Sequence, residues 1–491
     1  MSNHIHRILI DAFTQGTRSV HSYTATLNHV TPSVTNHQII QFSDIHDEKT
    51  DIDVSAYSNL LIVGAGKASI SCVSALESIF NSYQSLRNIC GTVISKHGFY
   101  HPNTTDQLIQ HINIVTASHP ISDHSTLQHT HTILQQLQSV EPRTLIIFVL
   151  TGGASSLFEL PVDGVSLDDL IQFNQIMQRS GANILELNQL RQCISKVKSG
   201  RLLQYVQPDC TLITLVMSDV IGDNLNIIGS APTYINPVSS TQRYHVNNTL
   251  HRYNLLSGSN KLPDSILHIL KENQNKQIQP AIQPSNTYIK LIANNYNALQ
   301  HAQHTIQQST TQPIYTLIVT DRLSGDVSAV SEFITSIIES CIVNNQPCKL
   351  PCCLLFGGEC TVQFNNTNYN TADCTSPPTQ QHESTHYKGG RNQHLALLLS
   401  KQIQHLSGVT ILCGSTDGND HVDNIAGAII DCNTYANAVQ HIIDVDRYIN
   451  TFDSYHFFVE YDRLTHSQSH VDIGITNTNV ADIILVYIDT K

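Results

Sequence analysis

The chain has 491 residues, of which 40% are hydrophobic and only 13% are charged, so it can build two or three domains with sizeable cores. Acidic residues outnumber basic ones by 39 to 26, and the resulting net charge of -13 argues against a sequence-independent nucleic-acid binder. No apolar run approaches the roughly 18 residues of a membrane span, so neither nucleic acid nor a membrane is expected as a partner.

The 12 cysteines form no CxxC pairs and show no regular spacing, and Cys352 and Cys353 are neighbours inside a strand-like run. We therefore expect buried thiols in a reducing compartment rather than disulfides or zinc ligands. The first ten residues are too polar for a signal peptide, which favours a cytoplasmic location.

A helical period over 7–22 opens the chain, and short apolar strands then alternate with helices. The expected strands are 58–63, 92–96, 112–117, 144–150 and 212–217, and the helices between them include 69–80, 123–137 and 168–180. This alternation predicts a doubly wound, Rossmann-like parallel sheet, which we assign to a first domain over residues 1–240.

Two of these strands run into glycine turns that could approach a ligand. The first turn is Gly64-Ala65-Gly66-Lys67, and the second is Thr151-Gly152-Gly153-Ala154-Ser155. Lys67 would point from the first helical turn toward anything bound at the strand end. The alternative is that the glycines only allow close packing of helix on strand and that Lys67 is solvated.

Charged side chains follow in two further places. Asp219 and Asp223 come directly after strand 212–217, where they suit a Mg²⁺ site, a general base or a turn with Asx caps. Arg191 and Lys198 are seven residues apart and share one helical face, which is either a ligand-binding or a solvated basic surface.

Residues 241–286 contain three prolines around short helices and are expected to connect the domains. The α/β pattern restarts at 287, so we assign residues 287–491 to a second domain. Its expected strands are 288–293, 314–319, 352–356, 409–414 and 483–488, with helices at 296–308, 328–344 and 394–405. The polar stretch Asn365–Tyr387 cannot build a core and predicts a mobile loop inserted before Arg391.

The second domain carries a third glycine turn, Lys388-Gly389-Gly390-Arg391-Asn392-Gln393, directly before a helix. An arginine fork and a helix N-terminus both favour phosphate or carboxylate. Gly357-Gly358-Glu359 and Thr416-Asp417-Gly418 end two neighbouring apolar runs. Together these turns predict a phosphate site at the ends of parallel strands, with a solvated surface turn as the alternative.

Taken in series, the motifs are specific. They comprise Gly64–Ala68, Thr151–Ser155, Glu186-Leu187-Asn188 with Arg191, Lys198–Leu202, Ser218–Asp223, Gly357–Glu359, Gly389–Gln393, Thr416–Asp420 and Thr478-Asn479-Val480. This ordered set resembles the class II glycerate kinases, the family with a C-terminal MOFRL domain, here about residues 350–491. The resemblance covers the chain from about residue 7 to 488.

The resemblance implies a two-domain α/β enzyme with its active site in the interdomain cleft. Family members use ATP and Mg²⁺ to phosphorylate D-glycerate, generally at the 2-hydroxyl. Lys67 and Arg391 match the most suggestive basic residues of the family. This chain departs from the family at Ala154, usually a third glycine, and at His394, usually an acid. The loop before Gly389 is longer, and 472–476 replaces the usual Gly-Pro-Thr-Gly-Thr.

From the resemblance and the strand-end positions together, we assign the following roles. The catalytic residues are Lys67, Arg391 and Asp219, and the candidate Mg²⁺ ligands are Asp223, Glu359 and Asp417. The substrate- or nucleotide-binding residues are Gly64, Gly66, Thr151, Gly152, Gly153, Ser155, Asn188, Arg191, Lys198, Gly357, Gly358, Gly389, Gly390 and Asn392.

Two other functions stay open. Gly64-Ala65-Gly66 could belong to a nicotinamide-dependent hydroxypyruvate reductase, although Ser69 stands where the dinucleotide fingerprint has its third glycine. A non-catalytic ligand-binding protein on the same fold is the second alternative. The protein is expected to be a monomer or a homodimer.

Overall fold

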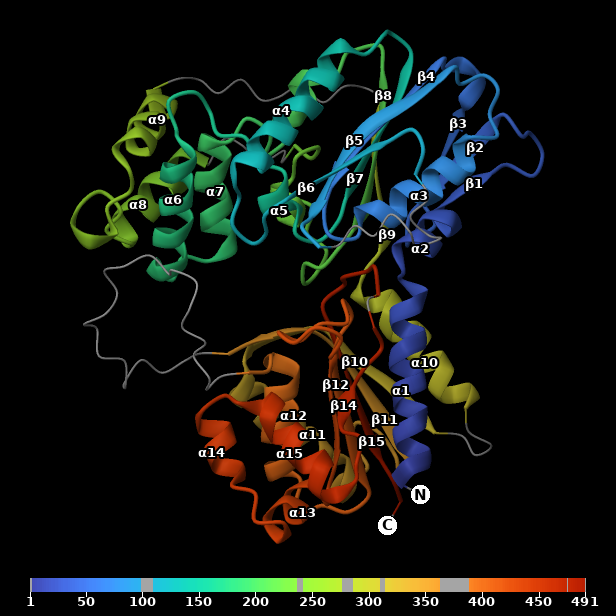
Figure 1. The fold of residues 1–491 in the computed structure, drawn as a ribbon, viewed down its shortest axis with the longest axis vertical. Coiled ribbons are helices and arrows are strands. Elements are labelled where there is room, and N and C mark those ends of the chain that lie inside the picture. Colours follow the sequence, from blue (N-terminus) through green and yellow to red (C-terminus); the bar gives the residue numbers. More distant parts are fainter. Residues whose placement is uncertain are drawn as a thin grey trace. The chain divides into compact units, whose positions relative to one another are not determined.

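A computed structural model describes residues 2–98, 109–235, 242–275, 286–309, 314–362, 388–474 and 476–490. It divides into two compact units, shown in Figure 1. The N-terminal unit holds residues 21–294, and the C-terminal unit holds residues 1–20 and 295–491. The expected loop at Asn365–Tyr387 lies outside the described residues.

The N-terminal unit is built on a six-stranded sheet in the order β6-β5-β4-β7-β8-β9, in which all pairs are parallel. β7 and β8 are buried along their whole length, as expected for central strands covered on both faces. The strands are β4 (Asn59–Ala65), β5 (Asn88–Lys96), β6 (Asn113–Ala117), β7 (Thr144–Leu150), β8 (Thr211–Met217) and β9 (Thr287–Ala293). The order reverses between β4 and β7, so the predicted doubly wound, Rossmann-like sheet is confirmed.

Helices and a small antiparallel sheet complete this unit. Asp123, Ser166 and Asn183 each form a capping box, which fixes where α4, α6 and α7 begin. The helices are α2 (Ser22–His29), α3 (Ser69–Phe80), α4 (His124–Ser139), α5 (Ala154–Leu157), α6 (Leu167–Ser180), α7 (Ile184–Ile194), α8 (Gln242–Arg252) and α9 (Asp264–Asn275), with 3₁₀ turns at Val54–Ala56, Arg201–Tyr205, Ile228–Ser230 and Gly258–Asn260. The small sheet comprises β1 (Val30–Pro32), β2 (Ile39–Ser43) and β3 (Lys49–Asp53).

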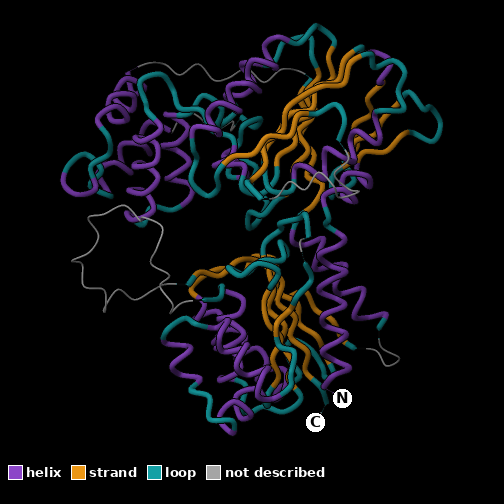
Figure 2. Tube along the Cα trace, in the orientation of Figure 1, coloured by secondary structure: helices purple, strands orange, loops and turns teal. Residues whose placement is uncertain are grey.

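Helices α6 to α9 form a group of their own beside the sheet (Figure 2). Their apolar faces share one core, to which Phe173, Leu190, Leu250 and Ile266 each contribute a buried side chain.

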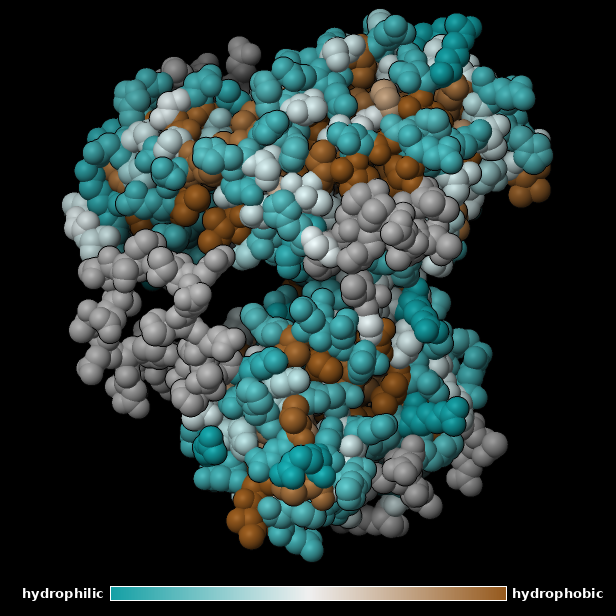
Figure 3. Space-filling model, in the orientation of Figure 1, coloured by the Kyte–Doolittle hydropathy of each residue, from teal (hydrophilic) through white to brown (hydrophobic). Residues whose placement is uncertain are grey.

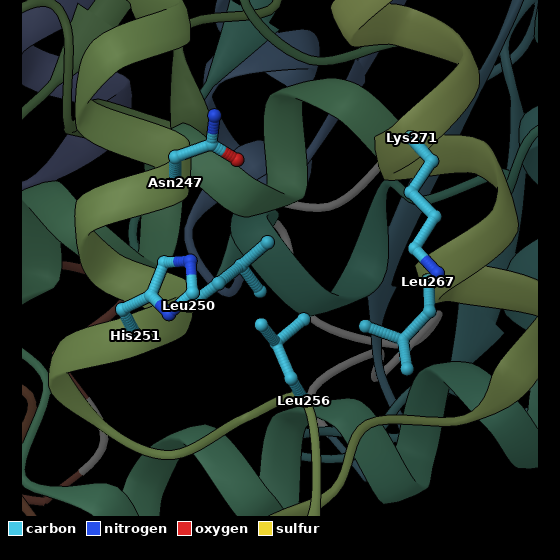
Figure 4. A pocket seen from close by; sticks show the side chains of 6 residues that line it. All are labelled: Asn247, Leu250, His251, Leu256, Leu267 and Lys271. Atoms are coloured by element: carbon cyan, nitrogen blue, oxygen red, sulfur yellow. The ribbon is translucent and has the colours of Figure 1, made fainter.

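A pocket of about 350 Å³ opens between α8 and α9, as Figure 4 shows. It is lined by Asn247, Leu250, His251, Leu256, Leu267 and Lys271. Residues 241–286 therefore contribute two packed helices to this unit, beyond the connection that we expected.

The C-terminal unit has a mixed six-stranded sheet in the order β10-β11-β15-β12-β13-β14. β15 runs antiparallel to both of its neighbours, β11 and β12, so those two strands point the same way. The strands are β10 (Tyr315–Asp326), β11 (Cys352–Thr361), β12 (Val409–Ser415), β13 (Gly427–Asp431), β14 (His470–Val471) and β15 (Asp482–Ile488). The helices are α1 (Ser2–Ser19), α10 (Asn295–Gln308), α11 (Val327–Asn344), α12 (Arg391–Gln402), α13 (Thr434–Gln440), α14 (Val445–Asn450) and α15 (Ser454–Thr465).

These units divide the chain differently from the ranges predicted above. β9 was assigned to the second domain, but it pairs with β8 and completes the first sheet. α1 was assigned to the first domain, but it packs on α10 so closely that a Cβ on Gly16 would lie 2.7 Å from the Ala298 carbonyl oxygen. Local sequence shows that a strand or helix exists but not which distant element it packs against.

Within the described residues, α11 is the one helix long and apolar enough to cross a membrane. Its Val330, Ile334 and Ile338 are buried in the apolar core of the C-terminal unit. We therefore regard α11 as a core helix. On the face drawn in Figure 3, polar and apolar side chains are interspersed over both units.

Candidate active site

The first candidate region lies where the strand order of the N-terminal sheet reverses, at the carboxyl ends of β4 and β7. Hydrogen bonds brace the two glycine turns together: the Lys67 amide donates to the Gly152 carbonyl at 2.9 Å, and the Thr151 amide donates to the Ala65 carbonyl at 3.1 Å. The Thr151 hydroxyl also accepts from the Ala68 amide at 3.2 Å. Such a reversal point is where ligands bind in open α/β sheets.

The glycines of the first turn serve this packing. A Cβ on Gly64 would collide with the backbone of Val149, and a Cβ on Gly66 would collide with Thr151. Gly66 also has φ +137°, which side chains rarely tolerate. These two glycines are thus explained by close backbone approach.

Cationic side chains gather beside the second turn. A Cβ on Gly153 would lie 3.1 Å from the His119 ring and 3.4 Å from Cγ of Lys67. Burial, followed by the positive charges of Lys67 and Lys96, lowers the pKa of His119 to about 4. Two ammonium groups and a neutral imidazole therefore lie at the ends of three neighbouring strands, an arrangement that suits a small oxyanion.

Lys96 and His119 were absent from the predicted set. Lys96 is the last residue of β5, and His119 follows the end of β6 by two residues. Both positions could have been found by asking which polar side chains share the strand-end edge with Lys67.

The aspartates after β8 belong to the same edge of the sheet. Asp223 has φ +53° and accepts a 2.6 Å hydrogen bond from the side-chain amide of Asn294, which directly follows β9. Asp219 is half-buried two residues after the end of β8. Within the described ranges, no three His, Cys, Asp or Glu side chains converge on a metal position. A metal here would depend on phosphate oxygens and water for most of its ligands.

Arg191 and Lys198 do not form a solvated basic face. The Lys198 side chain is only 1% exposed, and its ammonium donates to the Ser155 carbonyl at 2.5 Å and lies 3.4 Å from a carboxylate oxygen of Glu159. Arg191 donates through Nε and Nη2 to the side-chain oxygen of Asn174. Lys198 is thus built in behind the turn that carries Ser155, and Arg191 is held by Asn174 of α6.

Asn188 lies one helical turn before Arg191, on α7. Its Oδ1 accepts a 3.2 Å hydrogen bond from the Ser230 hydroxyl. Its Nδ2 is buried and has no partner among the described residues. A buried donor of this kind is satisfied by a ligand or an ordered water.

The second candidate region lies in the C-terminal unit, where β11 and β12 end on either side of the start of β15. The register places Asp482 opposite Gly358 on one side and opposite Ser415 on the other. The strand ends thus meet at one edge, as predicted, although the sheet is mixed rather than parallel.

Arg391 is the centre of this second region. Its Nε and Nη2 donate to the two carboxylate oxygens of Asp482 at 2.5 and 2.9 Å. Its Nη1 lies 2.8 Å from a carboxylate oxygen of Glu359. Burial alone would lower the pKa of Arg391, but these carboxylates raise it above its usual value. All three guanidinium nitrogens therefore contact a carboxylate, two of them Asp482 and one of them Glu359.

The N-terminus of α12 is also occupied by a side chain of the protein. Asp420 is buried and accepts from the backbone amides of Asn392 and Gln393 at 3.1 and 2.8 Å. A Cβ on Gly390 would collide with the carboxylate of Asp420. We predicted a bound phosphate at this helix end, but the amide groups that would hold it are capped by Asp420.

The remaining glycines here are explained by packing. Side chains on Gly357, Gly358 and Gly389 would collide with Asn295, Leu323 and Ser454, respectively. Asp417 accepts from the Ser415 hydroxyl and the Asn419 amide, both at 2.9 Å, and so closes an Asx turn.

His394 occupies the position where an acid was expected. Its ring is buried and lies 5.0 Å from the ring of Phe452. Burial lowers its pKa to about 4, so the ring is neutral at physiological pH. The histidine thus takes the role of a core residue.

Comparison with known proteins places the chain in a family. Residues 11–271 match the family described as a domain of unknown function (DUF4147), and residues 352–482 match the MOFRL family. The chain is 29% identical to the D-glycerate 2-kinase of Thermotoga maritima, over 87% of this chain and 90% of that one. It belongs to the glycerate kinase family. It is 28% identical to the glycerate 2-kinase of Pyrococcus horikoshii, over 96% and 94% of the two chains.

Solved structures support the same family assignment. The crystal structure of the T. maritima glycerate kinase superposes on this glycerate kinase family member with a TM-score of 0.76, 26% identity and 99% coverage of both chains. A P. horikoshii crystal structure gives a TM-score of 0.74, 26% identity and the same coverage. An Agrobacterium vitis relative named for hydroxypyruvate reductase is 29% identical over 86% of this chain and 97% of its own.

Proposed function

We propose that this protein transfers a phosphoryl group from ATP to D-glycerate and forms 2-phosphoglycerate. The observation that carries the proposal is the grouping of Lys67, Lys96 and His119 at the strand-order reversal of the N-terminal sheet. Phosphoryl transfer depends mainly on positioning and charge neutralisation, which this grouping can supply. The names of the T. maritima and P. horikoshii relatives support glycerate and its 2-hydroxyl.

The residues take these roles in the proposal. Lys67 and Lys96 bind an oxyanion of substrate or nucleotide, and the backbone amides of Gly152 and Gly153 assist them. Asp219 accepts the proton of the reacting hydroxyl. Arg391 neutralises phosphate charge through the edge that now faces Glu359.

Mg²⁺ fits only as a partly phosphate-held ion. Asp223, Glu359 and Asp417 stay candidate ligands, but they do not form a cluster of three acids within the described residues. When bound, such an ion would neutralise phosphate charge. Each carboxylate would bind it directly or through water.

The test is an assay with D-glycerate and ATP, with and without Mg²⁺, in which ADP is measured. The product is identified by adding enolase alone or enolase with phosphoglycerate mutase, because only 2-phosphoglycerate is consumed by enolase directly. We expect ADP formation that depends on the metal and a product that enolase consumes without the mutase. Full activity in excess EDTA would contradict the metal requirement.

A second candidate is the NADH-dependent reduction of hydroxypyruvate, which the name of the A. vitis relative favours. Ser69, the first residue of α3, stands where a dinucleotide fingerprint has its third glycine, which argues against it. Oxidation of NADH in the presence of hydroxypyruvate, without ATP, would support this function. Binding of D-glycerate without either reaction would instead indicate a non-catalytic binding protein.

A further inference from the structure

The contacts of Arg391 differ in how firmly they are held. Asp482 has a side-chain exposure of only 4%, and it holds the guanidinium through two hydrogen bonds. Its backbone is fixed at the start of β15, and its carbonyl accepts from the Asn295 side chain at 2.9 Å. Asp482 is therefore a permanent partner that sets the orientation of the guanidinium plane.

The second partner, Glu359, is more accessible. Its side chain is 44% exposed, and it meets Arg391 through a single 2.8 Å contact at Nη1. Because one member of this ion pair is exposed, solvent screens the pair, and another anion can replace the Glu359 carboxylate.

The α12 amides are capped by Asp420, whereas the Nη1 edge of Arg391 faces the exposed carboxylate of Glu359. We propose that Glu359 is a resident anion on Arg391: its carboxylate occupies the place that a phosphate oxyanion of the ligand takes on binding. Asp482 is the positioning residue that keeps this edge directed to the exchange site. The inference rests on the proposed function only in assuming that the ligand is a phosphate.

Glu359 would then compete with phosphate for Arg391 and so lower the affinity of the protein for phosphate. Its side chain would move aside when a multiply charged oxyanion binds. This role differs from that of a metal ligand, which would strengthen phosphate binding. The two roles predict opposite effects of removing the carboxylate charge.

The test is isothermal titration calorimetry of the full chain with inorganic pyrophosphate in EDTA. We expect Glu359→Gln to bind pyrophosphate about threefold more tightly than the wild type, as expected from releasing an exposed ion pair. The matched control is Glu339→Gln, which changes the same net charge at a similarly exposed glutamate that faces His405 instead of Arg391. We expect a smaller gain there.

Two further variants locate the effect. In an Arg391→Met background, Glu359→Gln should change pyrophosphate affinity no more than Glu339→Gln does. Asp482→Asn should weaken pyrophosphate binding, and Asp482→Glu should restore part of it, with melting temperature measured for each. Equal affinities for the two Gln variants, or weaker binding by Glu359→Gln, would overturn the proposal. Absence of ADP formation by the wild type would instead contradict only the proposed function.

Discussion

Two turns of this molecule carry nearly the same sequence signal and use it in opposite ways. Beside the turn at Gly152-Gly153 lie Lys67 and a neutral His119, whose pKa the charge of Lys96 also lowers. The turn at Gly389-Gly390 leads into Arg391, which is paired with the carboxylates of Asp482 and Glu359. The amides at the start of α12 are capped by the carboxylate of Asp420. Glycine shows that something approaches the backbone closely, and the fold decides whether that group is a ligand or a side chain of the protein itself.

The largest expected effect is on kcat, when Lys67 beside the first of these turns is replaced. Lys67→Ala should lower kcat about 10³-fold, because it removes a cation that stabilises the charge in phosphoryl transfer. Its melting temperature should change little, since Lys67 lies at a turn and outside the apolar cores. Lys49→Ala, at an exposed position, is the control in a coupled ADP assay. A near-wild-type rate for Lys67→Ala would place the reaction elsewhere.

Replacing Arg391 should cost stability as well as activity. Arg391→Ala leaves the buried Asp482 carboxylate without its partner, which destabilises the C-terminal unit by about 3–5 kcal/mol. Arg391→Lys should also lower stability and activity, because an ammonium cannot donate the bidentate pair of hydrogen bonds to Asp482. The measurement is calorimetric unfolding. The double variant Arg391→Met with Asp482→Leu should be more stable than Arg391→Met alone, and the reverse order would contradict the buried-charge explanation.

The glycines themselves offer a finer comparison. Gly390→Ala should destabilise the C-terminal unit by about 1–3 kcal/mol, because its Cβ displaces the Asp420 carboxylate from the α12 amides. Gly153→Ala, at φ +85°, should lower activity through contact with His119 and Lys67. Gly164 has a similar φ of +89° and nothing within 4 Å of the added carbon, so Gly164→Ala measures backbone strain alone. Equal activity of Gly153→Ala and Gly164→Ala would argue against a site at Gly153.

The last expected effect is on the pH dependence of stability. Burial lowers the pKa of His394 from 6.5 to about 4, so the unfolded chain binds this proton more readily than the folded one. The titration of His394 leaves the free energy of unfolding undiminished above pH 6.5. As pH falls toward 4, it lowers the free energy of unfolding by on the order of 2–3 kcal/mol. His119 acts in the same direction in the N-terminal unit. Melting temperature between pH 7 and 4 should therefore fall less steeply for His394→Gln than for the wild type, and an unchanged slope would contradict this.

The sequence by itself determined the strands and the order of the motifs. β7 was predicted at its observed bounds, and β8 to within one residue, because buried parallel strands are continuous apolar runs that end at polar or glycine turns. The family likewise followed from the ordered motifs. These signals are local, so they can be read without knowing what lies across the sheet.

Only the tertiary structure decided the partners of those elements. Asp482 is 91 residues from Arg391 in the chain, and it meets the arginine only because β15 is inserted between β11 and β12. For Lys198 the sequence left a ligand-binding and a solvated position open, and the fold buries it against Glu159. Ion pairing and burial depend on strand order and helix packing, which the amino-acid pattern of one segment does not contain.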